Sequence, residues 1–271
     1  MKAPYTRLLL FTAVAAFFYS SCQKSEVKPV ATTAADTAAV NKQIALNLVR
    51  VLSGSYGGTN INDGVKAQSN ISTTHTDPIE SRIVPLCGFI IDTTFSSKTA
   101  SKDTVKVFSG NFRFVYTCST NRPDGYRVHD SLVYTGTAPV FKNSFTVAQN
   151  YTVKATDSTY KHVVTDGSIL SEVNNLVYHD GFSVGYDFVS NRYQLHQLKM
   201  DIAGGKPADI ISGTADFVSV TSYLHYGQEN YTESRTYGNI TFLGNHRAKL
   251  TIAGTGKSFM IDLAAGTVKA I

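Results

Sequence analysis

Alternation of apolar and polar residues over most of the chain is the feature that most limits its fold. From Val65 onward, segments rich in Val, Ile, Thr, Tyr and Phe change polarity at every second residue, and Gly, Asn, Asp and Pro separate them. These segments are 105–117, 126–136, 144–156, 182–189, 192–202, 215–226, 239–244, 248–254 and 258–263. A period of two is that of a β-strand with one buried and one solvated face. We therefore predict an all-β fold built on a large curved antiparallel sheet, either an open sheet or a half barrel.

A single helix is predicted ahead of the strands, over residues 36–53. Either Asp36 or Asn41 can cap its start, and Gly54 follows its end. Spacings of three and four residues place the apolar side chains on one helix face: Ile44, Leu48, Val51 and Leu52. We expect this face to cover part of the packed side of the sheet, so that residues 36–271 form a single β domain with an N-terminal helix.

The first 21 residues have the layout of a secretory signal peptide. Lys2 and Arg7 supply the positive start, residues 8–19 are apolar, and Ser20-Ser21 place small side chains at the end. The apolar run is shorter than the roughly 20 residues that a membrane span requires. We therefore predict that residues 1–21 are a cleaved signal peptide. Residues 22–35, which are rich in Ala, Thr, Ser and Lys, are predicted to be a flexible tether.

Two small residues followed at once by Cys22 resemble the lipobox of bacterial lipoproteins. Tyr19 departs from the leucine usually found three positions before the cysteine, as in the looser lipoboxes of Bacteroidetes-type lipoproteins. The stretch CQKSE (22–26) is similar to the Gln-Lys-acidic signal that directs some of these proteins to the cell surface. The C-terminal run of short strands and glycine turns also resembles the endings of uncharacterised members of that group, which have no assigned activity. The resemblance implies a lipid on Cys22, with the membrane as partner, and an outer-membrane anchor facing the periplasm or the cell surface.

Cys87 and Cys118 are the other two cysteines, and both lie in strand-like segments. A hairpin with its outer ends at these positions would bring the two thiols together, and conditions outside the inner membrane permit a disulfide. We predict that Cys87 and Cys118 form a disulfide; two free buried thiols are the alternative.

No catalytic or metal-binding signature stands out. The P-loop-like AGTGKS (253–258) lacks the upstream glycine and precedes a strand rather than a helix. The seven histidines contain no closely spaced pair of the kind that zinc sites use, and no Gly-x-Ser-x-Gly occurs. Glu172 stands alone, while Glu229 and Glu233 lie in a polar stretch, so paired carboxylates are not indicated. We expect no enzyme activity, no metal and no cofactor.

Charge argues against a nucleic-acid partner. Without Lys2 and Arg7, the chain has 23 basic and 20 acidic residues, and they are interspersed. The expected function is therefore a non-catalytic binding or surface-interaction module. A carrier of a lipid or other apolar molecule is the alternative, and a hydrolase is third. Tyrosines are expected at sheet margins, although six of them could instead stack on saccharides: Tyr116, Tyr134, Tyr186, Tyr193, Tyr223 and Tyr226.

Asp followed by Ser or Thr and then a small apolar residue or Thr recurs along the chain. The pattern resembles the O-glycosylation signal of Bacteroidetes extracytoplasmic proteins. The acceptors that this resemblance implies are Thr37, Thr93, Thr104, Ser131 and Ser158. Glycans there would require these side chains to face solvent; ordinary β-strand composition is the alternative.

Overall fold

The computed structural model describes residues 34–63, 65, 87–120, 122–180, 182–202, 208–224 and 232–271, with the side chains from residue 40 onward. Ala38–Ile271 form one compact unit, to which the following description applies. The predicted signal peptide and Cys22 lie outside the described residues. No helix in the described part of the chain is long and apolar enough to cross a membrane.

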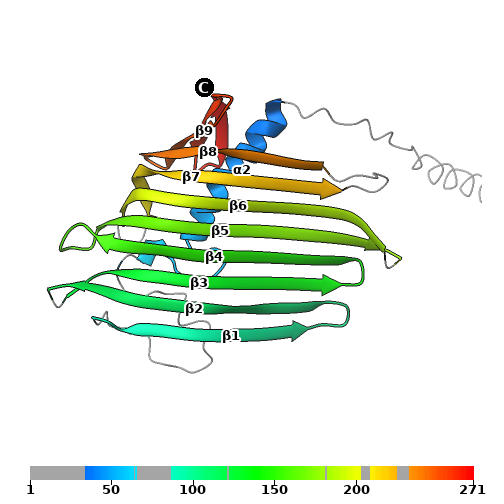
Figure 1. Ribbon diagram of the computed structural model, residues 1–271, viewed down its shortest axis with the longest axis horizontal. Helices are drawn as coiled ribbons and strands as arrows, with labels where there is room; N and C mark the ends of the chain where they lie inside the picture. The colour runs from blue at the N-terminus through cyan, green and yellow to red at the C-terminus, as the bar shows by residue number, and fades with distance from the viewer. Residues whose placement is uncertain are drawn as a thin grey trace, which may run out of the picture. The chain divides into compact units, whose positions relative to one another are not determined.

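Eleven strands form one antiparallel sheet in which each strand pairs with the next along the chain (Figure 1). They are β1 Ile90–Ala100, β2 Val105–Ser119, β3 Arg122–Ala138, β4 Phe141–Ala155, β5 His162–His179, β6 Phe182–Asp201, β7 Asp209–Leu224, β8 Thr232–Gly244, β9 Arg247–Ile252, β10 Ser258–Asp262 and β11 Thr267–Ala270. The sheet is not closed into a barrel, because β1 and β11 lie at opposite ends of the strand order. The all-β prediction, with an open sheet, is confirmed.

Two strand predictions are wrong in detail. Segments 182–189 and 192–202 belong to one strand, β6, because the polar pair Ser190-Asn191 stays in the ladder rather than turning. The strand β5 was not predicted, although it is among the longest. Three of its positions on the packed face are Thr165, Gly167 and Ser171, so its alternation of apolar and polar residues is weak.

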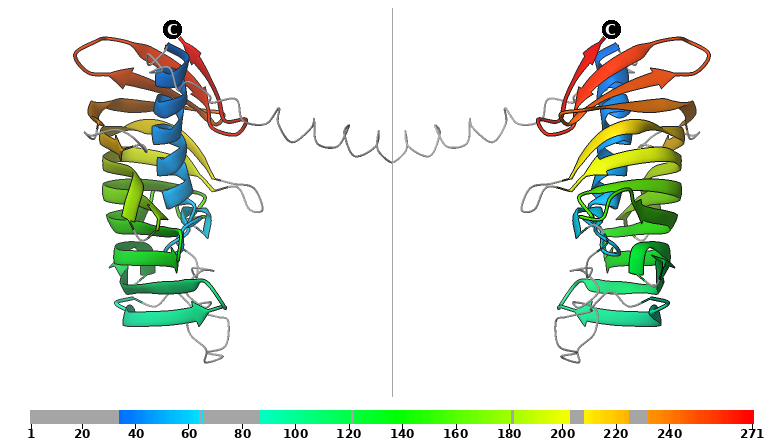
Figure 2. Two further views of the ribbon diagram at one scale, coloured as in Figure 1. Left: turned by 90° about the vertical axis from the view of Figure 1, so that its right-hand side faces the viewer. Right: turned by 90° about the vertical axis from the view of Figure 1, so that its left-hand side faces the viewer.

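The helix α2, Ala34–Leu52, packs against one face of the sheet (Figure 2). Its apolar stripe is buried as predicted, with Leu48 and Ala45 fully inaccessible. Asp36 and Asn41, the two predicted caps, both lie inside the helix, which begins before residue 36 and includes the last two residues of the predicted tether. The Tyr193 hydroxyl of β6 donates a hydrogen bond of 2.8 Å to the carbonyl of Ile44, which fixes the helix against the centre of the sheet.

The chain that leaves α2 crosses the same face and carries a buried polar cluster. The Gln149 side-chain amide donates to the Val51 carbonyl at 3.2 Å, and the Thr59 hydroxyl contacts both Gln149 and Tyr151. Asp130 is 1 % exposed beside this cluster, and neither of its carboxylate oxygens has a hydrogen-bond partner. The Gly58 backbone passes so close that a Cβ there would lie 2.7 Å from Asp130 Oδ2.

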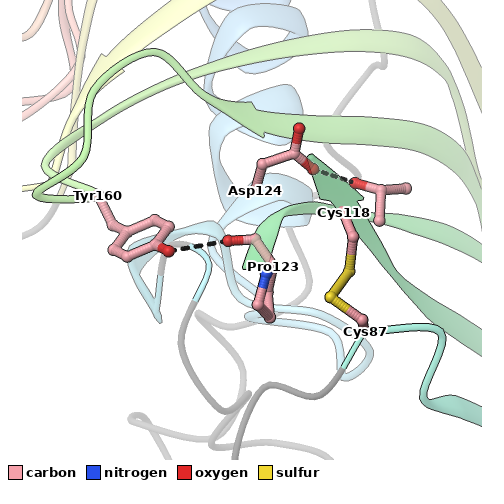
Figure 3. Close-up of a disulfide and its surroundings, with 6 residues drawn as sticks. Cys87, Cys118, Pro123, Asp124 and Tyr160 are labelled. Atoms are coloured by element: carbon pink, nitrogen blue, oxygen red, sulfur yellow. Dashed lines mark hydrogen bonds between the residues drawn. A yellow bond between two sulfur atoms is a disulfide. The ribbon is translucent and has the colours of Figure 1, made fainter. Parts of the chain in front are cut away.

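The predicted disulfide is present between Cys87 and Cys118, with 5.6 Å between their Cα atoms (Figure 3). It closes the outer end of the β1–β2 hairpin, where the Tyr116 N–H also donates to the Phe89 carbonyl at 3.1 Å. The start of β3, next to this disulfide, is held by a 2.9 Å hydrogen bond that the Tyr160 hydroxyl donates to the Pro123 carbonyl. The pairing follows from hairpin geometry, as the sequence indicated.

Candidate functional site

The face of the sheet opposite α2, here called the outer face, carries one unbroken polar row. Strand register places one residue of this row on each of ten neighbouring strands, from β1 to β10. The members are Asp92, Arg113, His129, Asn150, Ser168, Gln194, Asp216, Asn239, Thr251 and Ser258. Because neighbouring strands lie about 4.8 Å apart, this row presents a hydrogen-bonding side chain at regular intervals across the sheet.

A second row on the outer face, here called the mixed row, lies two residues along each strand from the polar row. It begins with three small or apolar side chains and then carries larger polar ones on either side of a valine: Ser131, Ala148, Leu170, Arg192, Val218 and Tyr237. Tyr237 is 54 % exposed, whereas Leu170 and Val218 are half-buried.

A groove lies between the two rows, and we call it the cross-strand groove. Its first part, of about 480 Å³, runs over β3 to β7, and its second, of about 380 Å³, continues over β7 to β9. The two parts adjoin at Asp216 and Phe217, so together they span seven strands, a distance of about 29 Å at the usual strand spacing. Half-buried Ala148, Leu170 and Val218 give the mixed-row side of its first part an apolar surface beside exposed Arg192, and the polar-row side carries exposed Asn150, Gln194 and Asp216.

Asp216 is held in place by side chains of both neighbouring strands. Asn239 donates a hydrogen bond of 2.9 Å to Oδ1, and His196 Nε2 lies 3.0 Å from Oδ2. The Thr241 hydroxyl in turn donates to Asn239 Oδ1 at 3.0 Å. The hydrogen bond from Asn239, assisted by His196, lowers the pKa of Asp216 below its ordinary value. The carboxylate is therefore ionised and held in one orientation before any ligand arrives.

A separate, apolar groove of about 550 Å³ lies on the outer face near one end of β5 to β8. Its walls include Leu176, Phe188 and Leu224, and the rings of Tyr186 and Phe188 stack with centroids 6.4 Å apart. Its polar members include Glu233, whose Oε2 lies 3.5 Å from the Ser222 hydroxyl. We call this the apolar groove.

Within the described residues, the candidate catalytic side chains do not gather in one place. His129 and Asp130 leave β3 on opposite faces, as the alternation predicted, with His129 exposed and Asp130 buried. Glu172 accepts a 3.0 Å hydrogen bond from Ser190. Glu229 lies outside the described residues, and residues 253–257 of AGTGKS form the turn between β9 and β10, with Ser258 beginning β10. Among the residues that the structure describes, no three His, Cys, Asp or Glu side chains form a group able to hold a metal ion.

The five glycosylation candidates are distributed over the fold. Ser158 is exposed in the turn between β4 and β5, and Thr104 is half-buried in the turn between β1 and β2. Thr93 is half-buried on the α2 side of β1, paired with Phe112, whereas Ser131 belongs to the mixed row. The side chain of Thr37 lies outside the described part. O-glycosylation stays a prediction at all five positions.

The six tyrosines named as possible saccharide platforms differ in exposure. Tyr116 and Tyr193 are each 2 % exposed in the core, and Tyr226 lies outside the described residues. Tyr134, Tyr186 and Tyr223 are half-buried. The exposed tyrosine beside the cross-strand groove is Tyr237, which the sequence did not single out because only strand register places it there.

Comparison with protein-family models, with curated proteins and with solved structures finds no match for this chain. The chemistry of the grooves is therefore the basis for inferring function.

Proposed function

We propose that the protein is a non-catalytic binding protein, anchored outside the inner membrane through a lipid on Cys22, that holds an extended ligand in the cross-strand groove. The observation that carries this proposal is that the two adjoining parts of the groove together extend across β3 to β9 along two rows of outward-facing side chains. The anchor rests on the lipobox-like sequence before Cys22. An extended ligand suits the groove because the path is long, shallow and open at the surface.

The distribution of the core supports a surface role. Packed apolar side chains occupy the α2 face, including Leu48, Phe114 and Leu195, each 0 % exposed. The cross-strand groove lies on the other face, so a ligand can bind there without displacing the helix. Binding through preformed surface groups needs little rearrangement of the protein, which lowers the entropic cost of association.

The test compares two variants of the full chain against the same panel of soluble glycans and peptides. Arg192→Ala with Gln194→Ala removes two exposed side chains from the groove, while Arg127→Ala with Thr152→Ala removes a matched exposed pair elsewhere on the outer face. We expect any binding that the wild type shows to be lost in the first variant and kept in the second. Binding that survives the groove variant unchanged would refute the proposal.

A second candidate function is that of a carrier of an apolar molecule, and the apolar groove favours it. Leu176, Phe188 and Leu224 could contact an acyl chain along one side. A fluorescent fatty acid tests this role. A carrier should lose the probe on Phe188→Ser and keep it in the Arg192→Ala, Gln194→Ala variant. Absence of fatty-acid binding to the wild type would remove this candidate.

A further inference from the structure

The backbone of the sheet limits what the cross-strand groove can bind. Strands β3 to β9 are paired on both sides along the groove, so their N–H and C=O groups are already used in the ladders. A peptide gains much of its affinity for a sheet by adding a strand to an open edge, and this groove offers no edge. Recognition in the groove must therefore come from side chains.

The side chains present are those that bond hydroxyl groups in pairs. Asn150 and Gln194 each offer an amide with two donors and an acceptor, Arg192 offers a planar fork of donors, and Asp216 offers two acceptors. Two neighbouring hydroxyls on a sugar ring present a donor and an acceptor at a spacing that such planar groups can match. Arg192 and Asp216 balance each other in charge, which favours a neutral ligand over an anionic or cationic one.

The groove also offers apolar and aromatic surface on which a sugar ring can pack. Leu170 and Val218 supply half-buried apolar surface, and Tyr237 supplies an exposed aromatic ring. A sugar ring has C–H faces that pack on such surfaces, while its hydroxyls point sideways toward polar walls. A nucleic acid would need a basic track instead, and the polar row carries acidic and uncharged members as well as Arg113.

The spacing between neighbouring strands also matches the length of a sugar unit. The polar row presents one side chain per strand at about 4.8 Å, which is close to the length of one sugar unit in an extended chain. Asn150, Ser168, Gln194 and Asp216 follow one another on neighbouring strands, so successive sugar units would meet successive side chains in the same way. Asp216 is held by Asn239 and His196, so its two acceptors need no reorganisation on binding.

We infer that the ligand of the cross-strand groove is a neutral oligosaccharide chain lying across β3 to β9. It would be hydrogen-bonded by Asn150, Arg192, Gln194 and Asp216 and packed on Tyr237 at one end. This inference rests on the proposed function and specifies its ligand class. It also implies that affinity rises with chain length, because each added unit reaches another strand until the groove is filled.

The experiment applies the full chain to an array of neutral and charged glycans and then titrates the best neutral series from two to eight units by calorimetry. We expect affinity to increase up to about six units, the number of strand intervals that seven strands provide. Gln194→Ala and Tyr237→Ala should each weaken binding about tenfold. The matched outer-face variant Arg127→Ala should bind as the wild type does, and circular dichroism should show all the variants folded.

The possible failures separate this inference from the proposed function. If no neutral glycan binds but a peptide or charged glycan binds and is lost in Gln194→Ala, the ligand class is wrong and the groove stays the binding site. If a neutral glycan binds with unchanged affinity in Gln194→Ala and Tyr237→Ala, both the inference and the assignment of the groove are wrong. Affinity that does not depend on chain length would overturn the lengthwise placement of the chain.

Discussion

Replacing Asp130 with Asn should stabilise the protein at high pH and leave it almost unchanged at low pH. Asp130 is 1 % exposed, and its carboxylate oxygens make no hydrogen bond of ordinary geometry, although the Gln149 backbone N–H lies nearby. Burial raises its pKa from 3.8 to about 8, and the nearby Gln149 backbone N–H offsets this rise only in part. An amide of the same shape removes the ionisation without creating a cavity.

The magnitude follows from proton linkage. Because the pKa is raised in the folded state, the unfolded chain ionises first, at about pH 4, while the folded protein keeps its proton until about pH 8. Within this window the contribution of Asp130 to the free energy of unfolding falls by about 1.4 kcal/mol per pH unit, on the order of 5 kcal/mol in all. Below pH 4 and above pH 8 the contribution is constant.

The assay is urea unfolding of wild type and Asp130→Asn at pH 5, 6.5, 8 and 9, with the disulfide intact. The quantity to compare is the difference between the two free energies of unfolding, since groups that titrate in both proteins cancel from it. We expect this difference to grow by about 4 kcal/mol in favour of the variant between pH 5 and pH 8. It should then stay level at pH 9.

A matched control is Asp187→Asn, which makes the same change at an exposed position on β6. It shows how much of any change comes from an Asp-to-Asn replacement as such rather than from burial of the carboxylate. If Asp130→Asn gives a difference that is flat from pH 5 to pH 8, Asp130 is not protonated in the folded protein and the reasoning is wrong.

Three further changes test the hairpin, the sheet and the anchor. Replacing Cys87 and Cys118 together with Ser should lower the free energy of unfolding by about 3–4 kcal/mol, because their 31-residue separation leaves a long unfolded loop unrestrained; equal urea midpoints for bridged and unbridged protein would contradict this. Gly167→Ala should lower the melting temperature markedly, because φ is +142° and the added Cβ would lie 2.3 Å from the Asn150 carbonyl oxygen of β4. The control Gly185→Ala should have little effect, because the added Cβ would lie 3.5 Å from the nearest atom, the Cβ of Val177. Cys22→Ala should abolish labelling by a radioactive fatty acid and release the protein from membranes; membrane association that persists would count against the lipoprotein prediction.

The fold could be predicted where one residue type dominates each face of a strand. In β2, Phe112, Phe114 and Tyr116 point to the core while Arg113 points to solvent, so the period of two is plain in the sequence. In β5, by contrast, the sheet buries Ser171, which is satisfied by a 3.2 Å hydrogen bond from Asn47 of α2. A contact over such a distance in the chain cannot be inferred from local alternation, and this is why β5 was missed.

The candidate site could not be predicted, because it depends on register. Each member of the polar row comes from a different strand, and a slip of one residue in any pairing would remove members from the row. Irregularities between Thr165 and Gly167 and between His196 and Lys199 set the register of β5, β6 and β7. The sequence shows a Gly at one of these places and no signal at the other, since Gln197 adopts a φ of +51° without being glycine.

One face of the sheet packs the core and the other is exposed, so the sheet can be stable and still present a long binding surface. α2 and the chain that follows it bury the apolar side chains of one face, so the outer face contributes little to the core. Exposed positions of this kind usually tolerate substitution within about 0.5 kcal/mol of unfolding free energy. Gln194 and Arg192 can therefore vary with the ligand while Leu195 and Tyr193, their neighbours in β6, remain fixed by packing against the helix side. It follows that variants of the groove separate binding from folding: loss of ligand with an unchanged urea midpoint is the result that a surface site requires.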